Sequence, residues 1–142
     1  MAVFRLAALQ APVLDGCEAR FDWLAAQLPD AVAAGANLVA LPELFAHGYH
    51  IGDTLRTLAE PQDGPLRARI GELARAHGLA ILYGYAERAG GRIFNAAACV
   101  DASGALVGHH RKLAIPPGFE RGIFTAGAGI RLFDLAGLRI AI

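Results

Sequence analysis

The stretch that decides the fold is Leu38-Val39-Ala40-Leu41-Pro42-Glu43-Leu44-Phe45. Four apolar residues run directly into a proline and a carboxylate, and such a run is typical of a strand buried on both faces. Pro42 cannot donate a hydrogen bond to a sheet, so we expect the strand to end there. Glu43 then follows the carboxyl end of a buried strand, where ligands bind in layered α/β proteins. A poorly solvated carboxylate at this position would suit a general base, and the alternative is a solvated glutamate that begins a loop.

The residues before this strand predict a β-α-β unit. Residues 3–10 are typical of a first strand, and the segment from Glu18 to about Ala34 has apolar residues at helical spacing. Pro29 interrupts that spacing, so we expect the helix to be kinked or split there. This order of elements favours a parallel pair of strands. The apolar positions that predict the helix are Phe21, Leu24, Ala25, Leu28 and Val32.

The residues after this strand predict a change to antiparallel pairing. Two long loops, 45–61 and 111–129, are candidates to carry function. The other predicted elements are a helix over 63–77, strands over 79–85, 92–100 and 105–110, and a hairpin over 130–142. The last apolar run has no stop signal, so we expect residues 1–142 to be the N-terminal part of a single, longer domain.

Composition excludes several classes of protein. Thirteen basic residues balance thirteen acidic ones without a charge run, which argues against a nucleic-acid partner. No apolar run reaches transmembrane length, so no membrane partner is expected. Cys17 and Cys99 lack the spacing of disulfide frameworks or metal sites, which favours a cytoplasmic protein. Only 18% of the residues are charged, which predicts that apolar surface meets another layer or another subunit, as in a homo-oligomer.

Several polar and aromatic residues are candidates for chemistry. Lys112 follows a predicted strand, and Glu120 lies in the same loop, so the lysine could stabilise an oxyanion beside a carboxylate. The alternative is a surface salt bridge. Tyr49 and Phe119 could line a substrate pocket or simply pack. His47 and His50 are spaced as His-x-x-His but lie in a glycine-rich loop without a third ligand, so we expect no metal site.

Taken in order, these motifs resemble the nitrilase superfamily, the carbon–nitrogen hydrolases. The resemblance runs over essentially all 142 residues, although no single motif is specific. The motifs are Arg5-Leu6-Ala7-Ala8-Leu9-Gln10, Leu41-Pro42-Glu43-Leu44-Phe45, Phe94-Asn95-Ala96-Ala97, His110-Arg111-Lys112, and Gly118-Phe119-Glu120-Arg121 with Phe124-Thr125.

The resemblance implies an α/β protein with an αββα sandwich, incomplete in these 142 residues, and a Cys–Glu–Lys catalytic set. By this resemblance Glu43 is the general base, Lys112 stabilises the tetrahedral intermediate, and Glu120 is an additional active-site glutamate. The implied substrate is a small amide or nitrile, and no cofactor is expected. The loop from Glu43 to Tyr49 is similar to that of amidases that act on aliphatic or amino-acid amides.

One part of the implied catalytic set is missing. The family's nucleophilic cysteine follows a strand like Leu138–Ile142, and neither Cys17 nor Cys99 matches that position. We therefore expect the nucleophile outside these residues. Amide hydrolysis is the leading hypothesis, and nitrile or N-carbamoyl amide hydrolysis is the nearest rival. Two further hypotheses are a non-catalytic assembly or binding fragment and a metal hydrolase that uses His47 and His50.

Overall fold

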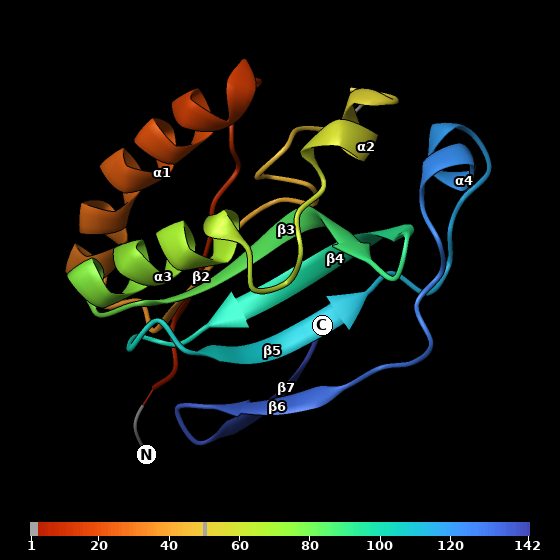
Figure 1. The fold of residues 1–142 in the computed structure, drawn as a ribbon. Helices are drawn as coiled ribbons and strands as arrows, with labels where there is room; N and C mark the ends of the chain where they lie inside the picture. The colour runs from red at the N-terminus through yellow and green to blue at the C-terminus, as the bar shows by residue number, and fades with distance from the viewer. Residues whose placement is uncertain (1–2, 50) are drawn as a thin grey trace.

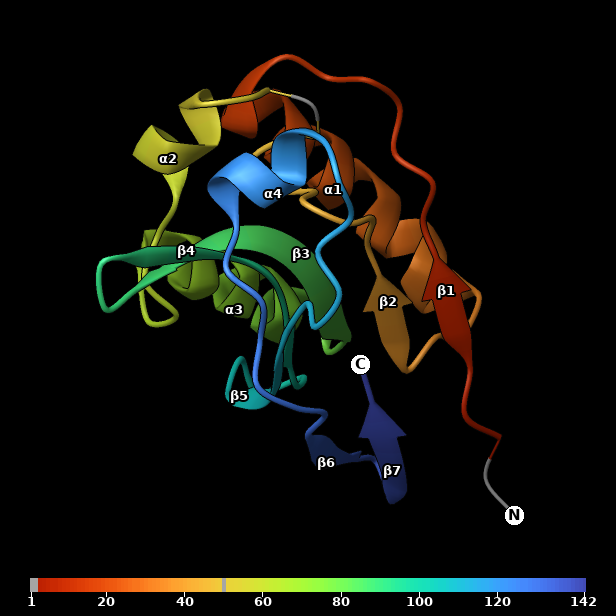
Figure 2. The ribbon, with the colours of Figure 1, turned by 90° about the vertical axis from the view of Figure 1, so that its right-hand side faces the viewer.

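A computed structural model describes residues 3–49 and 51–142. Helices α1 and α3 cover one face of a five-stranded sheet, and a two-stranded hairpin lies on the other face (Figures 1 and 2). The α/β class is confirmed, with one helical layer followed by two sheet layers of the expected sandwich. The elements are β1 (Leu6–Ala8), α1 (Gly16–Ala33), β2 (Leu38–Ala40), α2 (Thr54–Leu58), α3 (Pro65–His77), β3 (Ala80–Ala89), β4 (Arg92–Val100), β5 (Leu106–Arg111), α4 (Phe119–Ile123), β6 (Leu132–Leu135) and β7 (Leu138–Ala141).

Strand β2 lies inside the sheet, as its apolar sequence predicts. It pairs in parallel with β1 on one side and with β3 on the other. Leu38 and Val39 are 4% and 0% exposed, so both faces of the strand are covered. The predicted change of direction is confirmed, because β3, β4 and β5 pair antiparallel. The ends of β2 and β5 consequently carry the two loops in which function was expected.

Helix α1 is continuous through Pro29, so it is not split there, which was one of the two predicted outcomes. Proline removes one backbone donor, but Pro29 is exposed, and water can solvate the carbonyl group that loses its partner. The buried side of the helix supplies Phe21, Leu24 and Leu28, which are at most 2% exposed. Val32, predicted to face the core, is 43% exposed, and Ala31 faces the core instead.

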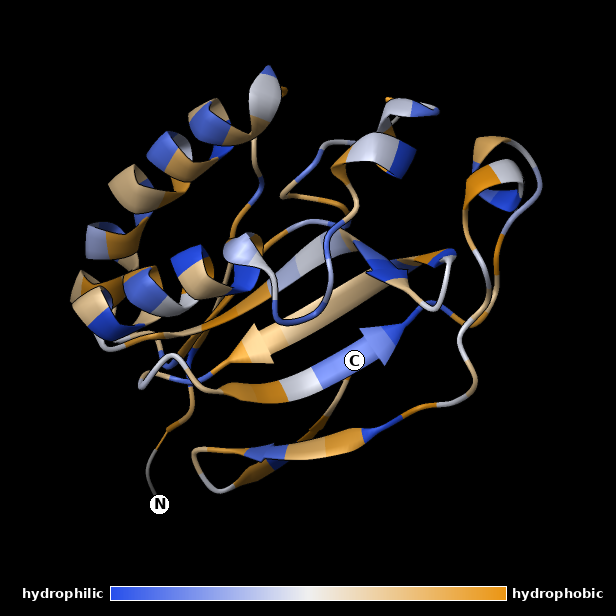
Figure 3. Cartoon of the chain, in the orientation of Figure 1, coloured by the Kyte–Doolittle hydropathy of each residue, from blue (hydrophilic) through white to orange (hydrophobic). Residues whose placement is uncertain are grey.

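The β6–β7 hairpin packs on the sheet face opposite the helices. Phe133 of β6 lies so close to Gly108 of β5 that a Cβ atom at residue 108 would be 2.6 Å from its ring. Buried Cys99 and Leu135 belong to the apolar cluster between the two layers. Figure 3 shows β5 changing from apolar residues at its start to hydrophilic residues at its end, next to the candidate site.

Two short helices, α2 and α4, interrupt the segments predicted to be loops. Each has five residues, too few to give a helical repeat in the sequence. Both contribute to an apolar cluster at one end of the sheet, where Leu55 and Ile123 pack with Leu44. Among the described residues, no helix has the length and apolar character needed to cross a membrane.

Candidate active site

The turn that carries Glu43 lies against strand β3. Residues 43–47 form turns after β2 ends at Ala40, and the Ala46 N–H donates to the Gly84 carbonyl oxygen at 3.2 Å. Leu44 has φ 52°, which is unusual for a residue with a side chain. The Glu43 side chain is 43% exposed. The expected poor solvation is therefore wrong, because Glu43 lies beyond the end of the strand and faces an open cavity.

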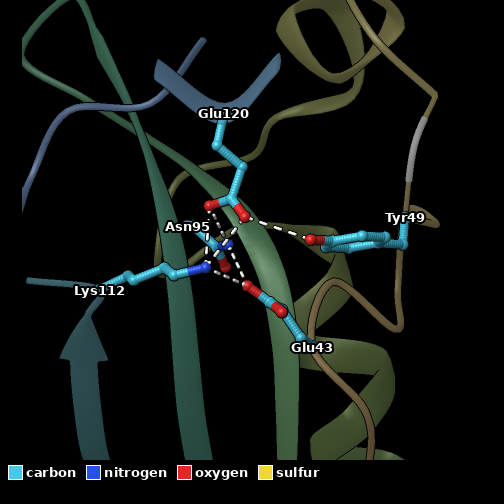
Figure 4. A network of polar contacts seen from close by, with 5 residues as sticks. All are labelled: Glu43, Tyr49, Asn95, Lys112 and Glu120. Atoms are coloured by element: carbon cyan, nitrogen blue, oxygen red, sulfur yellow. Dashed lines mark hydrogen bonds and ion pairs between the residues drawn. The ribbon is translucent and has the colours of Figure 1, made fainter. Parts of the chain in front are cut away.

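Lys112 lies between two carboxylates. Its ammonium Nζ donates to Glu43 Oε1 at 2.8 Å and to Glu120 Oε1 and Oε2 at 3.0 and 2.9 Å. Lys112 directly follows β5, and Glu120 lies on α4 (Figure 4). The three residues predicted from the sequence as catalytic are thus brought together from distant segments of the chain.

Asn95 belongs to the same network but was not among the predicted site residues. Its amide Nδ2 donates to Glu43 Oε1 at 2.6 Å and to Glu120 Oε2 at 3.3 Å, and its backbone carbonyl oxygen accepts from the Lys112 N–H at 2.8 Å. Asn95 lies within β4 and is 4% exposed. The available signal was an amide side chain within a strand whose other residues after Arg92 are apolar, since buried polar groups need partners.

The predicted substrate-binding residues, Tyr49 and Phe119, lie beside these carboxylates. The Tyr49 hydroxyl donates to Glu120 Oε1 at 3.3 Å. The two rings meet edge to face, with centroids 5.4 Å apart and an interplanar angle of 88°. Tyr49 is 46% exposed, so part of this residue is open to solvent beside the carboxylates.

Burial and charge differ between the two glutamates. Glu120 is 1% exposed, and its two carboxylate oxygens accept from Lys112, Asn95 and Tyr49. Glu43 is exposed, and no hydrogen bond to its Oε2 is found among the described residues. Partial burial lowers the pKa of Lys112, but hydrogen bonds to Glu43 and Glu120 outweigh it, so the pKa is raised above its ordinary value. Lys112 therefore remains charged at neutral pH.

Two cavities meet at Glu43. The larger is about 490 Å³, lies between the sheet and the β6–β7 side, and is lined by Asn95, His110 and Lys112 among others. The smaller is about 210 Å³ and is lined by residues 11–14, Arg20 and Tyr49 as well as the Glu43 turn. Pro42 and Glu43 line both, so Glu43 stands at their boundary.

Neither cysteine joins this network. Cys99 is fully buried in β4, and burial raises the pKa of its thiol to about 12. Cys17 lies in the first turn of α1. A buried thiol with a raised pKa is a poor nucleophile, and no cysteine lines the two cavities at Glu43.

His47 has a structural position. His47 is 6% exposed, and its Nδ1 accepts a hydrogen bond from the Ala86 N–H at 3.0 Å. Burial lowers the pKa of His47 to about 4, so the ring is neutral at pH 7. His50, its partner in the His-x-x-His motif, lies outside the described residues. Within 3–49 and 51–142, no group of three metal-ligating side chains gathers.

Relatives of this chain are hydrolases. It is 44% identical over 97 residues to "Hydrolase in pqqF 5'region" of Pseudomonas protegens, covering 67% of this chain and 34% of that protein. It is 37% identical over 140 residues to the bromoxynil-specific nitrilase of Klebsiella pneumoniae subsp. ozaenae, covering 89% of this chain and 40% of the nitrilase. The chain thus spans less than half the length of these curated relatives.

The solved structure of an amidase from Nesterenkonia sp. has the same fold. The TM-score is 0.85 over 97% of this chain and 54% of the amidase, with 22% identity, and this likeness shows the fold alone. The carbon-nitrogen hydrolase family model matches residues 5–142. That match spans nearly all of the described chain and includes Glu43, Asn95, Lys112 and Glu120. The chain therefore belongs to the carbon-nitrogen hydrolase family, the nitrilase superfamily.

Proposed function

We propose that this chain is part of an enzyme that hydrolyses the C–N bond of a small amide. The observation that supports this most strongly is the position of Lys112, whose Nζ lies within 3.0 Å of three carboxylate oxygens from Glu43 and Glu120. We further propose that the nucleophilic cysteine comes from residues outside these 142, since neither Cys17 nor Cys99 lines the cavities at Glu43.

In this proposal Glu43 is the general base. Its Oε1 accepts from Lys112 and Asn95, which fixes the carboxylate, while Oε2 is available for a proton. Glu43 would take the thiol proton as the sulfur attacks the amide carbon, and would later take a proton from water. Partial exposure of Glu43 to the cavity fits this role, because substrate and water must reach it.

Lys112 would stabilise the oxyanion, and Glu120 would position Lys112. Glu120 is buried and holds Nζ with both oxygens, so the ammonium group is placed before substrate arrives. Preorganised positive charge at the developing oxyanion is one of the strongest contributions to such catalysis. Substrate would compete with Glu43 for Lys112, because the Glu43 side chain is far more exposed than that of Glu120.

The proposed reaction balances in two steps. The thiol sulfur forms a bond to the amide carbon, the C–N bond breaks, and the thiol proton leaves with ammonia through Glu43. Water then adds to the thioester carbon as the C–S bond breaks; its proton returns to the thiolate through Glu43, and the carboxylic acid is released. No oxidant or reductant is needed.

Nitrile hydrolysis is the second candidate function, because a bromoxynil-specific nitrilase matches 89% of the chain. An N-carbamoyl amide substrate, or a non-catalytic assembly role, would follow if neither small amides nor nitriles reacted. Parallel assays of an aliphatic amide, the matching nitrile and an N-carbamoyl amine would separate these possibilities. Release of ammonia from the amide alone would support the amidase proposal.

The deciding experiment is Glu43→Gln in the complete gene product. We expect amide hydrolysis to fall by at least about 10²-fold, because a general base contributes this much or more. Glu18→Gln is the matched control: Glu18 is exposed, pairs with Arg69 at 2.6 Å and is not part of the lining of either cavity at Glu43. Circular dichroism would verify that both variants fold. Undiminished activity in Glu43→Gln would overturn the proposed role.

We also propose that the enzyme is cytoplasmic and a homo-oligomer. Several large apolar side chains are exposed, among them Leu6 at 57%, Ile130 at 67% and Leu132 at 62%. Apolar surface of this kind is commonly covered by another layer or subunit. Light scattering of the complete gene product would give the mass, and a monomer at micromolar concentration would contradict the oligomer.

A further inference from the structure

The smaller cavity at Glu43 combines apolar walls with one cation. Its volume is about 210 Å³. Residues 11–14 supply Ala-Pro-Val-Leu to one wall, and Leu44 and Phe45 supply another. Arg20, from α1, is the only basic residue in the lining, and Glu43 is the only acidic one, among the residues that the structure describes. We name it the Arg20 cavity.

The Arg20 guanidinium is held by a hydrogen bond to the backbone but forms no ion pair with a carboxylate among the described residues. Its Nη2 donates to the Leu14 carbonyl oxygen at 2.5 Å, and no ion pair joins it to a carboxylate among residues 3–49 and 51–142. Gly48 allows this placement, because a Cβ atom there would lie 2.5 Å from Nη2. Most of the guanidinium donors therefore remain available to an acceptor that enters the cavity.

The carboxylates around Glu43 would disfavour an anionic substrate unless a cation such as Arg20 lay nearby. Two carboxyl groups, those of Glu43 and Glu120, share the single ammonium group of Lys112. A substrate anion held near these groups alone would be repelled. Arg20 supplies a second cation, in a cavity that Glu43 also lines.

We infer that the Arg20 cavity binds a carboxylate on the acyl part of the substrate, so that the enzyme prefers the monoamide of a short dicarboxylic acid. This inference rests on the proposed amide hydrolysis at Glu43. The amide group would lie at Glu43 and Lys112, two or three methylene groups would contact the apolar walls, and the carboxylate would meet the guanidinium. Arginine suits this contact because its planar fork can bind a carboxylate with two hydrogen bonds.

Binding to the complete gene product tests this inference directly. The Glu43→Gln background slows turnover by at least about 10²-fold, and calorimetry compares three amides of equal chain length: succinamate, neutral butyramide and cationic β-alaninamide. We expect succinamate to bind about 10- to 100-fold more tightly than butyramide, the range for a charge-assisted hydrogen bond, and β-alaninamide to bind most weakly. Added salt should reduce the preference for succinamate, because the interaction is between charges.

Variants then assign the effect to one residue. Arg20→Met should remove the preference for succinamate over butyramide, whatever its effect on the binding of both amides, and Arg20→Lys should retain part of the preference. Arg67→Met is the control, because Arg67 lies on α3, outside the lining of the cavity, and its substitution removes the same charge. Equal binding of succinamate and butyramide, undetectable succinamate binding, or a preference that survives Arg20→Met would overturn the inference.

The same experiment separates this inference from the proposed function. If Glu43→Gln abolishes hydrolysis but succinamate shows no preference, amide hydrolysis stands and the carboxylate site fails. If succinamate binds through Arg20 but no amide is hydrolysed by the unaltered protein, the carboxylate site stands and the proposed reaction fails. Should Arg20→Met not fold, because Arg20 also fixes Leu14, the salt dependence and the β-alaninamide comparison decide the question without any change at residue 20.

Discussion

Glycine 84 lets the backbone that carries Glu43 lie directly on strand β3. A Cβ atom at residue 84 would be 2.5 Å from the Leu44 nitrogen, 2.8 Å from the Pro42 carbonyl oxygen and 3.0 Å from the Glu43 carbonyl carbon. All three are backbone atoms, which cannot rotate away as a side chain could. The backbone around Glu43 can therefore take this position only because Gly84 has no Cβ atom.

Gly84→Ala is expected to displace the Glu43 turn. The added methyl group should cost about 1–3 kcal/mol of unfolding free energy, typical of overpacking, and reduce amide hydrolysis by roughly 10²-fold through misplacement of Glu43. Urea unfolding and steady-state kinetics would measure both. Gly129→Ala is the control, since a Cβ atom there would meet nothing within 4 Å. Equal activity of the two variants would contradict this explanation.

His47 links stability to pH at the single-residue scale. Burial lowers the pKa of His47 to about 4 from an ordinary 6.5, so the unfolded chain binds the proton more readily. The contribution of neutral His47 to the free energy of unfolding is therefore fully present above about pH 6.5 and is lost as pH falls toward 4. Between about pH 7.5 and pH 5 this amounts to about 2 kcal/mol.

The His47→Asn variant should lose that pH dependence. Asparagine can still accept from the Ala86 N–H but does not titrate. Urea unfolding at about pH 7.5 and pH 5 would show the difference between the two pH values shrinking by about 2 kcal/mol in the variant. The difference between the two pH values is taken for each protein separately and then compared, so the contributions of the other histidines cancel. An unchanged difference would mean that His47 does not stay neutral in the folded state.

At the scale of elements, a buried ion pair fastens β5 to β3 across the strand between them. Glu87 of β3 is 1% exposed and accepts from Arg111 of β5 at 2.5 and 2.9 Å and from His109 at 2.7 Å. The Arg111 guanidinium also lies 4.0 Å from the ring centroid of Phe94 on β4. Because Lys112 follows Arg111 directly, these contacts fix the end of the strand from which the active-site ammonium extends.

Glu87→Gln should weaken this attachment by about 1–3 kcal/mol, the range for charge-assisted hydrogen bonds. Burial raises the pKa of Glu87, but hydrogen bonds from Arg111 and His109 outweigh it and lower the pKa to about 2. The stabilisation is therefore present above the ordinary value of 4.5 and disappears as pH falls toward 2.

Urea unfolding of the two proteins at about pH 6 and pH 3 would measure this stabilisation. The difference between them should be smaller at the lower pH. Exposed Glu72→Gln on α3 serves as the control. A difference that stays the same at both pH values would show that the Glu87 carboxylate is not the source.

At the scale of the whole molecule, the sequence allowed the layers to be predicted better than the details of the site. The apolar run before Pro42 predicted β2, and the glycine turns predicted the antiparallel strands, because both are local patterns. The exposure of Glu43 was not predictable, since it depends on which distant segments cover it. Asn95 was missed because a single polar residue in a strand does not repeat along the sequence and so forms no periodic pattern. Helix α4 was missed because its five residues are too few to show a helical repeat.

The positions of the site residues along the chain have a consequence for folding kinetics. Lys112 and Glu43 are 69 residues apart, and Tyr49 and Glu120 are 71 apart, whereas β3 and β4 are joined by a tight turn at Gly90 and Gly91. Closing a long loop costs more entropy than closing a short one, so contacts between distant residues tend to form late. We expect the β3–β4 hairpin and the helices to form first and the Lys112 network last. At that stage much of the core would already be packed while Glu43 and Glu120 were still far from Lys112. Formation of the Lys112 network would then mark the end of folding.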